Sequence, residues 1–395
     1  MTQPRPTLLR QRDHHDSGRV GMVELFFDLV FVFAVTQLSH SLLTHLDLAG
    51  AAQTALLMLA VWWVWIYTSW ATNFLDPEAK PVRAMLFALM LGGLLMSASI
   101  PKAFGSHGFA FACAYAGMQI GRTGFLLWAL RDAPENLRRN FHRVMIWLLL
   151  SGACWIAGGF ASGEARFGWW MLALGLEIVS PIVFFWVPGM GRSNTRDWSV
   201  DGHHMAERCA LFVIIALGES LLITGATFAE LEWNAAAVTA FVFAFLGSVA
   251  MWWVYFDTGA EHASERIAHS DDPGRIARVA YTYLHILIVA GIIVSAVADE
   301  LVLVHPAHAN GAAMAAILGG PALYLLGNAL FKWVSYDRRF PPLSHLVGLA
   351  LLGVLTWFAF THHFSALALG GFTTGTLVLV AAWETMALRR PARVS

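Results

Sequence analysis

The sequence predicts an all-α fold, a polytopic membrane helix bundle of about twelve transmembrane helices. Of its 395 residues, 57% are hydrophobic and only 13% are charged, whereas an ordinary soluble domain carries roughly 25% charged residues. The mean hydropathy is +0.60, and apolar stretches recur along the whole chain. Too little polar surface remains for a soluble enzyme, a disordered protein or a disulfide-stapled secreted domain. The net charge of −1 gives no basic field for nucleic acid.

Each predicted span is a mostly apolar stretch of about 20 residues, the length that a helix needs to cross the hydrocarbon core. The spans cover residues 22–44, 49–70, 82–100, 107–130, 142–161, 166–187, 205–227, 234–256, 276–298, 310–331, 343–361 and 367–387. The polar gaps between them are short and leave no room for a soluble domain. Glu24 and Asp28 lie in the opening turns of the first span, which argues against a cleaved signal peptide with its charge-free core.

Lysines and arginines predict the orientation, because loops rich in them stay in the cytoplasm. Of the 25 in the chain, 22 fall in the first 21 residues, in the tail, or in the gaps after even-numbered spans and the opening residues of the spans that follow them, and Lys332 is one of these. The opposite side holds only Lys102 and Arg166, and Arg122 lies deep inside a span. We therefore expect a multi-pass protein of the cell membrane with both termini in the cytoplasm.

The two halves of the chain resemble each other in order. Val61-Trp62-Trp63-Val64-Trp65 ends the second span, and Met251-Trp252-Trp253-Val254-Tyr255 ends the eighth. Six spans per half predict two repeats in the same orientation, although chance recurrence of tryptophan at headgroup depth is an alternative. The expected parts are a basic cytoplasmic segment, a first repeat, a linker, a second repeat and a basic tail. Their residues are 1–21, 22–187, 188–204, 205–387 and 388–395.

Ionisable side chains inside the spans are the candidate functional residues. A charged side chain near the bilayer centre costs about 2.5–3.5 kcal/mol on insertion scales, so it normally faces the bundle interior or water. The candidates for an ion or substrate path are Glu24, Asp28, Arg122, Glu177, Glu207, Arg208, Glu219 and His285. Arg122 is expected to pair with Glu177 or Asp28, which lie at a comparable depth. Such a pair can line a path or merely lock two helices together.

The acids of the first and seventh spans have both functional and purely structural interpretations. Glu24 and Asp28 are four residues apart and share one helical face, where they can attract a cation or share a proton. Glu24 and Glu207 also suit a helix N-terminus through the macrodipole, without any further role. Arg208 and Glu219 are too far apart along one helix to pair, so each is expected to have partners on other helices. His285 is either a proton shuttle or a hydrogen-bonded core residue.

Two stretches, in the first and the seventh span, combine acids with long apolar runs. They are Val23-Glu24-Leu25-Phe26-Phe27-Asp28-Leu29-Val30-Phe31-Val32-Phe33-Ala34 and Glu207-Arg208 followed by Leu211-Phe212-Val213-Ile214-Ile215-Ala216-Leu217-Gly218-Glu219-Ser220. Both resemble the hallmark motifs of the bacterial low temperature requirement A (LtrA) family. The resemblance extends from about residue 20 to 385 and implies a bacterial multi-pass membrane protein. The family is named after growth at low temperature, so the resemblance implies a fold and a location rather than a reaction.

A more distant similarity is to the endolysosomal potassium channel family, which also has two six-helix repeats. Phe27-Asp28 lies at a place comparable to that family's first-helix motif, but Met22 occupies the position of its arginine. Leu211 stands where the second repeat of that family has an aspartate. The similarity is therefore an analogy of architecture.

Three functions are compatible with these features. A transporter or channel for an ion, a proton or a small solute is favoured by the duplicated halves and the intramembrane acids. An intramembrane lipid-modifying enzyme and a noncatalytic envelope scaffold or sensor are the alternatives. The sequence has no nucleophile or nucleotide motif and no histidine pair at zinc spacing, so we expect no cofactor and no metal. The expected partners are the lipid bilayer and an ion or small-molecule substrate, with a homo-oligomer left open.

Overall fold

The apolar stretches form helices in the computed structural model, which describes residues 8–10, 20–193, 200–257, 273–336 and 339–388. Within these ranges the chain has twelve helices of 19 to 29 residues and no β-strand beyond two isolated bridges. The helices divide into two compact units, and each unit is described by itself. One boundary between them falls inside helix α7 (Gly202–Glu230), directly after Arg208, and residues 42–51 are assigned to unit 2.

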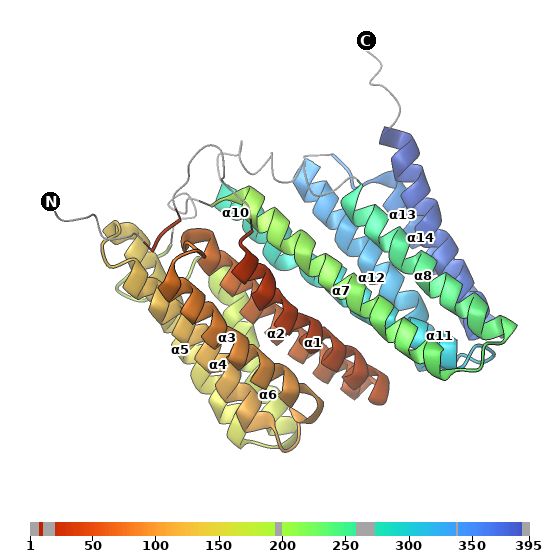
Figure 1. Cartoon of the computed structure of the whole chain (residues 1–395), viewed down its shortest axis with the longest axis horizontal. Helices are drawn as coiled ribbons and strands as arrows, with labels where there is room; N and C mark the ends of the chain where they lie inside the picture. The colour runs from red at the N-terminus through yellow and green to blue at the C-terminus, as the bar shows by residue number, and fades with distance from the viewer. Residues whose placement is uncertain (1–7, 11–19, 194–199, 258–272, 337–338, 389–395) are drawn as a thin grey trace, which may run out of the picture. The chain divides into compact units, whose positions relative to one another are not determined.

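Unit 1 contains the first six long helices except residues 42–51 at the end of the first and the start of the second, together with the first turns of α7 and the short α10 (Pro273–Ala277). Its long helices are α1 (Met22–Thr44), α2 (Leu48–Phe74), α3 (Lys80–Ser99), α4 (Gly108–Ala129), α5 (Glu135–Phe160) and α6 (Gly163–Ile182). Helix α4 packs against α3 and α5, and α5 packs against α6 (Figure 1). Residues 8–10 run beside the end of α2: the Arg10 amide donates to the Phe74 carbonyl at 3.0 Å, and the Asp76 amide donates to the Leu8 carbonyl at 2.9 Å.

Unit 2 contains the rest of α7 and five further long helices. These are α8 (Ala235–Phe256), α11 (His285–Val304), α12 (Gly311–Tyr336), α13 (Leu343–Thr361) and α14 (Ala366–Leu388), and a π-helical segment, Arg278–Leu284, leads into α11. Helices α11 and α12 cross closely, because Gly291 and Gly327 carry no Cβ; an added one would lie 2.5 Å from the Tyr324 amide nitrogen and 2.8 Å from that of Ile288.

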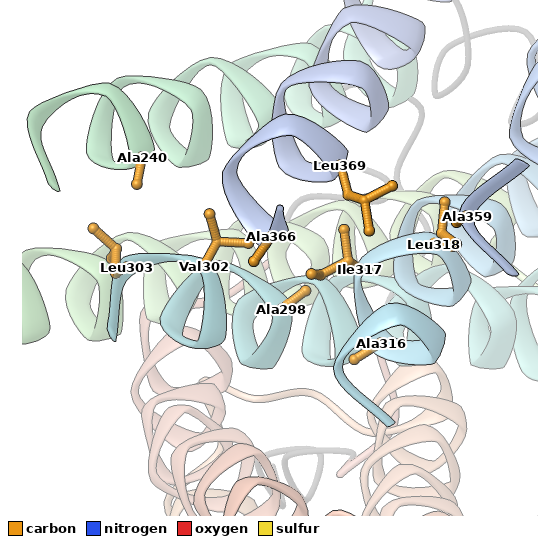
Figure 2. Close-up of a cluster of buried hydrophobic side chains, with 10 residues drawn as sticks. All are labelled: Ala240, Ala298, Val302, Leu303, Ala316, Ile317, Leu318, Ala359, Ala366 and Leu369. Atoms are coloured by element: carbon orange, nitrogen blue, oxygen red, sulfur yellow. The ribbon is translucent and has the colours of Figure 1, made fainter. Parts of the chain in front are cut away.

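The core of unit 2 is a cluster of buried aliphatic side chains drawn from α8, α11, α12, α13 and α14 (Figure 2). Val302, Ile317 and Leu369 are each no more than 4% exposed and lie at its centre. Alanines such as Ala240 and Ala298 let the helices approach one another closely. The cluster is entirely apolar, so the charged residues of this unit lie elsewhere.

The predicted spans agree with the helices in number and differ at some ends. The spans 22–44 and 343–361 match α1 and α13 exactly in their bounds. The span 166–187 extends too far, because α6 ends at Ile182 and Phe184 and Phe185 take positive φ values of 55° and 46°. Residues with a left-handed backbone cannot continue a right-handed helix.

Lys332 is a further correction. The sequence analysis counted it in a polar gap, but it lies inside α12, which continues to Tyr336, and its side chain is buried. Its long stem is flanked by Phe331 and Trp333, so the apolar segment continues across the charge. A charge count alone cannot distinguish such a residue from a loop lysine.

Ten of the helices are long and apolar enough to cross a membrane. The two long helices outside this set, α4 and α6, carry Gln119, Arg122, Arg166 and Glu177, which lower their apolar character. The chain is a multi-pass helical membrane protein. Most of the expected N-terminal segment 1–21 and nearly all of the tail 388–395 lie outside the described residues.

Candidate functional site

Three helices of unit 1 bring polar side chains together at one end of α1. Each helix presents them four residues apart, so they line one face. We call this group the α1 charge network; its members are Glu24 and Asp28 of α1, Trp65, Ser69 and Asn73 of α2, and His204 and Arg208 of α7. The side chains of Glu24, Asp28, His204 and Arg208 are all 0% exposed. Two acids, an imidazole and a guanidinium are thus enclosed together.

Asp28 and Arg208 form the inner ion pair of this network. Asp28 Oδ1 lies 2.9 Å from Arg208 Nη2 and accepts a hydrogen bond from Trp65 Nε1 at 2.8 Å. The Arg208 guanidinium lies over the Trp65 ring, 5.6 Å from its centroid. Asp28 Oδ2 and Arg208 Nη1 are buried and have no hydrogen-bond partner among the described residues. The pair therefore keeps one acceptor and one donor group unused.

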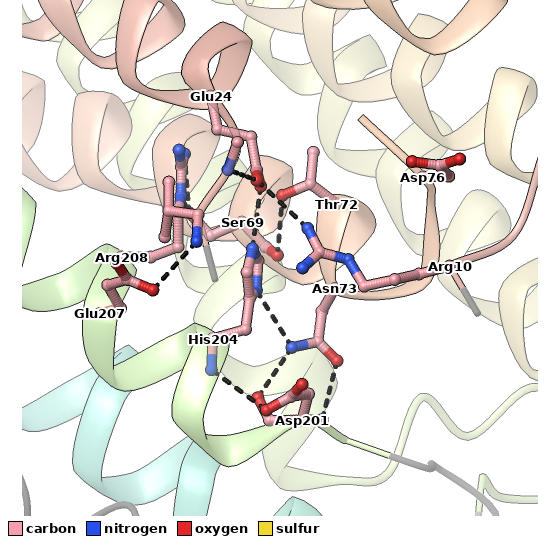
Figure 3. A network of polar contacts seen from close by, with 12 residues as sticks. Arg10, Glu24, Ser69, Thr72, Asn73, Asp76, Asp201, His204, Glu207 and Arg208 are labelled. Carbon is pink, nitrogen blue, oxygen red and sulfur yellow. Dashed lines mark hydrogen bonds and ion pairs between the residues drawn. The ribbon is translucent and has the colours of Figure 1, made fainter. Parts of the chain in front are cut away.

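Glu24 and His204 form the outer pair (Figure 3). The Asn73 side-chain nitrogen, which can only donate, lies 3.2 Å from His204 Nδ1. A neutral His204 therefore accepts at Nδ1 and donates from Nε2 to Glu24 Oε1, at 2.9 Å. Glu24 Oε2 also accepts from the Gly21 amide at 2.9 Å and pairs with Arg10 Nη2 at 3.2 Å. Glu24 is thus bound on both oxygens.

Glu207 binds the start of α1 rather than a charged side chain. Its Oε2 accepts the Val20 amide at 2.9 Å, as Glu24 accepts the amide of Gly21 (Figure 3). Both acids therefore accept hydrogen bonds from backbone N–H groups that directly precede α1. The macrodipole alternative placed Glu207 at the start of its own helix, whereas it binds the start of α1. Glu24 does more than this, because it also faces His204 and Arg10.

A second buried network of unit 1, the α4 network, surrounds Glu177 of α6. Its carboxylate accepts four hydrogen bonds, two on each oxygen. The donors are Tyr115 at 2.5 Å, Gln119 at 2.9 Å, Ser151 at 2.6 Å and Trp155 at 3.1 Å. Every lone-pair direction of this buried acid is therefore occupied by a neutral donor.

Arg122 is not paired directly with an acid, so the expected ion pair with Glu177 or Asp28 is wrong. Gln119 lies between the two charges: its Nε2 donates to Glu177, and its Oε1 accepts from Arg122 Nη2 at 2.6 Å. The other arm of Arg122 donates to the carbonyl of Val64 and the hydroxyl of Thr68, both at 3.3 Å. The side-chain amide of Gln119, one turn before Arg122, thus makes the contact with Arg122 that the sequence analysis assigned to a carboxylate.

Helix α2 contributes to both networks from neighbouring positions. Val64 and Thr68 contact Arg122, whereas Trp65 and Ser69 contact Arg208 and Asp28. Residues one apart on a helix point about 100° away from each other, so these pairs leave α2 on different faces. A single helix therefore separates the two sets of buried charges.

The remaining predicted residues, Glu219 and His285, belong to unit 2. Glu219 is buried in α7, 4% exposed. His285 Nδ1 lies 2.8 Å from the Ala280 carbonyl, which can only accept, so Nδ1 carries the proton and Nε2 accepts from the Tyr255 hydroxyl at 2.8 Å. Both ring nitrogens are bonded, as the core-residue alternative for His285 expects.

Sequence reasoning missed a group of ionisable residues in unit 2. Lys332, His345 and Glu384 are all buried, and they come from α12, α13 and α14. Glu384 lies inside the predicted span 367–387, so the criterion that selected Glu219 could also have found it. His345 follows Ser344 at the start of a span, where solvation is the default interpretation. Among the described residues no group of three or more His, Cys, Asp or Glu side chains is arranged to hold a metal ion.

Comparisons with known proteins agree with this architecture. The family model described as "Bacterial low temperature requirement A protein (LtrA)" matches residues 19–382. A relative from Rhizobium meliloti (strain 1021), described as the uncharacterized protein RA0937, is 41% identical over 386 residues, which are 97% of this chain and 93% of the relative. No solved structure matches the chain. The chain belongs to the bacterial low temperature requirement A family.

Proposed function

We propose that this protein is a proton-conducting transporter or channel of the bacterial cell membrane, with Asp28 as the group that takes up the proton. The observation that carries the proposal is the incomplete bonding of a fully buried ion pair. Asp28 Oδ2 and Arg208 Nη1 have no hydrogen-bond partner among the described residues, although both side chains are 0% exposed. A purely structural pair would be expected to use these groups.

The energetics of buried ion pairs support a role beyond helix packing. Removing two charges from water costs several kcal/mol per ion, and replacing such a pair by apolar residues is often neutral or stabilising. A scaffold would therefore gain nothing from Asp28 and Arg208 that aliphatic side chains could not supply. Ionisable groups inside membrane segments typically mark ion pathways and proton relays.

The chemistry of the site allows a simple proton step. A proton that binds Asp28 Oδ2 forms an O–H bond there and leaves the carboxyl neutral. The charge of Arg208 then loses its counter-ion, and a buried guanidinium without one is costly. Protonation therefore favours a second arrangement in which Arg208 leaves Asp28 and keeps its bonds to Ser69 Oγ, which already accepts from its Nε and Nη2 at 3.3 Å. Release of the proton restores the pair.

Proteoliposomes with a pH-sensitive dye inside test the proposal. We expect the wild type to pass protons down an imposed pH gradient and Asp28→Asn to abolish this flux, because the amide cannot be protonated in this range. Asp47→Asn is the matched control, since Asp47 is an exposed acid outside the network. If the wild type passes no protons, the proposal is wrong, and the scaffold or lipid-modifying alternatives replace it.

A further inference from the structure

The buried charges of unit 2 that sequence reasoning missed form a compact triad. Lys332 Nζ lies 2.6 Å from Glu384 Oε2 and donates to the Val254 carbonyl at 2.7 Å. Glu384 Oε1 lies 3.4 Å from His345 Nδ1. Glu384 thus stands between a lysine and a histidine, each of which is no more than 2% exposed. No member of this triad belongs to the α1 charge network or the α4 network.

One nitrogen of the triad, His345 Nε2, has no hydrogen-bond partner among the described residues. His345 Nδ1 lies 3.2 Å from the Ser344 hydroxyl oxygen and 3.4 Å from Glu384 Oε1. With the proton of the neutral ring on Nδ1, its N–H faces both oxygens, and the carboxylate oxygen can only accept. The lone pair of the neutral imidazole is then on Nε2, which is buried and has no hydrogen-bond partner among the described residues. The buried Asn328 Oδ1, one turn before Lys332 on α12, likewise has no partner in these ranges. Two unused acceptors inside an enclosed polar site suggest that something binds there.

The α4 network of unit 1 has the same chemical order. Helix α4 is the fourth long helix of the first half and carries Tyr115, Gln119 and Arg122; helix α12 is the fourth of the second half and carries Tyr324, Asn328 and Lys332. A tyrosine is followed four residues later by an amide and three or four residues after that by a base. The acids, Glu177 and Glu384, both lie on the sixth long helix of their half.

The two arrangements differ in how the acid contacts the base and in which groups surround the acid. In unit 1 the amide of Gln119 separates base and acid, and the acid has four neutral donors. In unit 2 the base contacts the acid directly, and a histidine replaces neutral donors around Glu384. The first arrangement has no imidazole to accept a proton, whereas the second one does.

We propose that Lys332, His345 and Glu384 form a proton-binding site of unit 2, in which Nε2 of His345 accepts the proton. The imidazolium that results is stabilised by Glu384 beside Nδ1, and it is opposed by Lys332 and by its burial. The inference deepens the proposed proton-conducting function and rests on it for its role in flux. The binding itself does not depend on flux.

The other titratable groups around the triad are otherwise engaged. On α12 the Tyr324 hydroxyl donates to the Met251 carbonyl. On α8, Tyr255 binds His285, and Asp257 accepts from Thr385 at 2.9 Å. These contacts leave His345 Nε2 as the open proton acceptor of the group.

Nitrogen NMR of the protein labelled at histidine, in detergent, tests the binding directly. We expect one buried Nε2 to become protonated as the pH is lowered, and this signal to be absent in His345→Asn. Asparagine keeps an N–H near Glu384 but removes Nε2, so it preserves the local packing best. His363→Asn, at an exposed histidine, is the control that leaves the signal in place. A His345 resonance that stays neutral at every pH at which the protein remains folded overturns the inference.

Flux in proteoliposomes separates the two proposals. We expect His345→Asn to lower proton flux clearly below that of the wild type and of His363→Asn. Wild-type flux that Asp28→Asn abolishes but His345→Asn leaves unchanged would refute a role for the triad while keeping the proposed function. Absence of wild-type flux would refute the proposed function, and the titration of His345 would then still decide the proton-binding site.

Discussion

Two buried networks of unit 1 flank helix α2 and use the same kinds of side chain in opposite ways. The α4 network surrounds Glu177 with four neutral donors and holds Arg122 one amide away. The α1 charge network sets Asp28 directly against Arg208 and leaves one atom of each without a hydrogen-bond partner in the described ranges. In the α4 network every lone-pair direction of the buried acid is used in a hydrogen bond, whereas in the α1 charge network one acceptor and one donor are not used by any described residue.

The comparison separates a structural acid from a functional candidate. Burial alone does not, since Glu177 and Asp28 are 1% and 0% exposed. What differs is how much of the hydrogen-bonding capacity is used. An acid with four donors loses interactions in any other state, whereas an acid with an open oxygen can take up a proton without first losing a bond.

The largest effect is expected from Arg208→Met. Methionine leaves Asp28 without its counter-ion in a closed site, and breaking one side of a buried pair costs about 3–5 kcal/mol. Thermal unfolding of the purified protein in detergent measures this loss. The double variant Asp28→Asn with Arg208→Met should recover much of the stability, because no uncompensated charge remains. Equal instability of the single and double variants would show that the pair contributes by packing instead of charge.

Glu177→Gln should cause the next largest loss of stability. Its effect on proton flux should contrast with that of Asp28→Asn. The amide group turns its N–H₂ toward donors that need an acceptor, and each hydrogen bond to a charged group is worth about 1.5–3 kcal/mol. We expect a clear loss of thermal stability but proton flux per folded molecule close to that of the wild type. Asp28→Asn should instead abolish flux per folded molecule, and it should also lose stability, because the buried Arg208 is left without its counter-ion. Loss of flux in Glu177→Gln molecules that remain folded would place the α4 network on the path.

The smallest effect is expected from Trp155→Phe, which removes one of the four donors to Glu177. The three remaining donors keep the acid bonded, so the cost should be about 1.5–3 kcal/mol, as for a single hydrogen bond to a charged group. Trp65→Phe makes the parallel change at Asp28, which keeps Arg208 as its partner. Thermal unfolding of the two variants under the same conditions compares the stability lost when one tryptophan donor is removed from each acid. A cost at Trp155 much above that range would mean that ring packing dominates there.

The sequence by itself determined the all-helical membrane fold and the positions of its helices. Composition and span length are sufficient for this, because in lipid the backbone groups of a span must be bonded within the span. The spacing of Glu24 and Asp28 also predicted that they share a face, and the helix period alone determines that. Arg208 was expected to have partners on other helices, and it pairs with Asp28 of α1.

Only the tertiary structure decided which charges meet. Arg122 was assigned an acid at comparable depth, but Gln119 one turn away intercepts it, and depth along the membrane normal contains no information on which faces are opposed. Lys332 was counted as a loop residue, although α12 continues past it and α14 supplies Glu384. The physical reason is the same in both cases: a span's length follows from its own residues, whereas a buried charge is satisfied by side chains from other helices, and their arrangement is a property of the packed bundle.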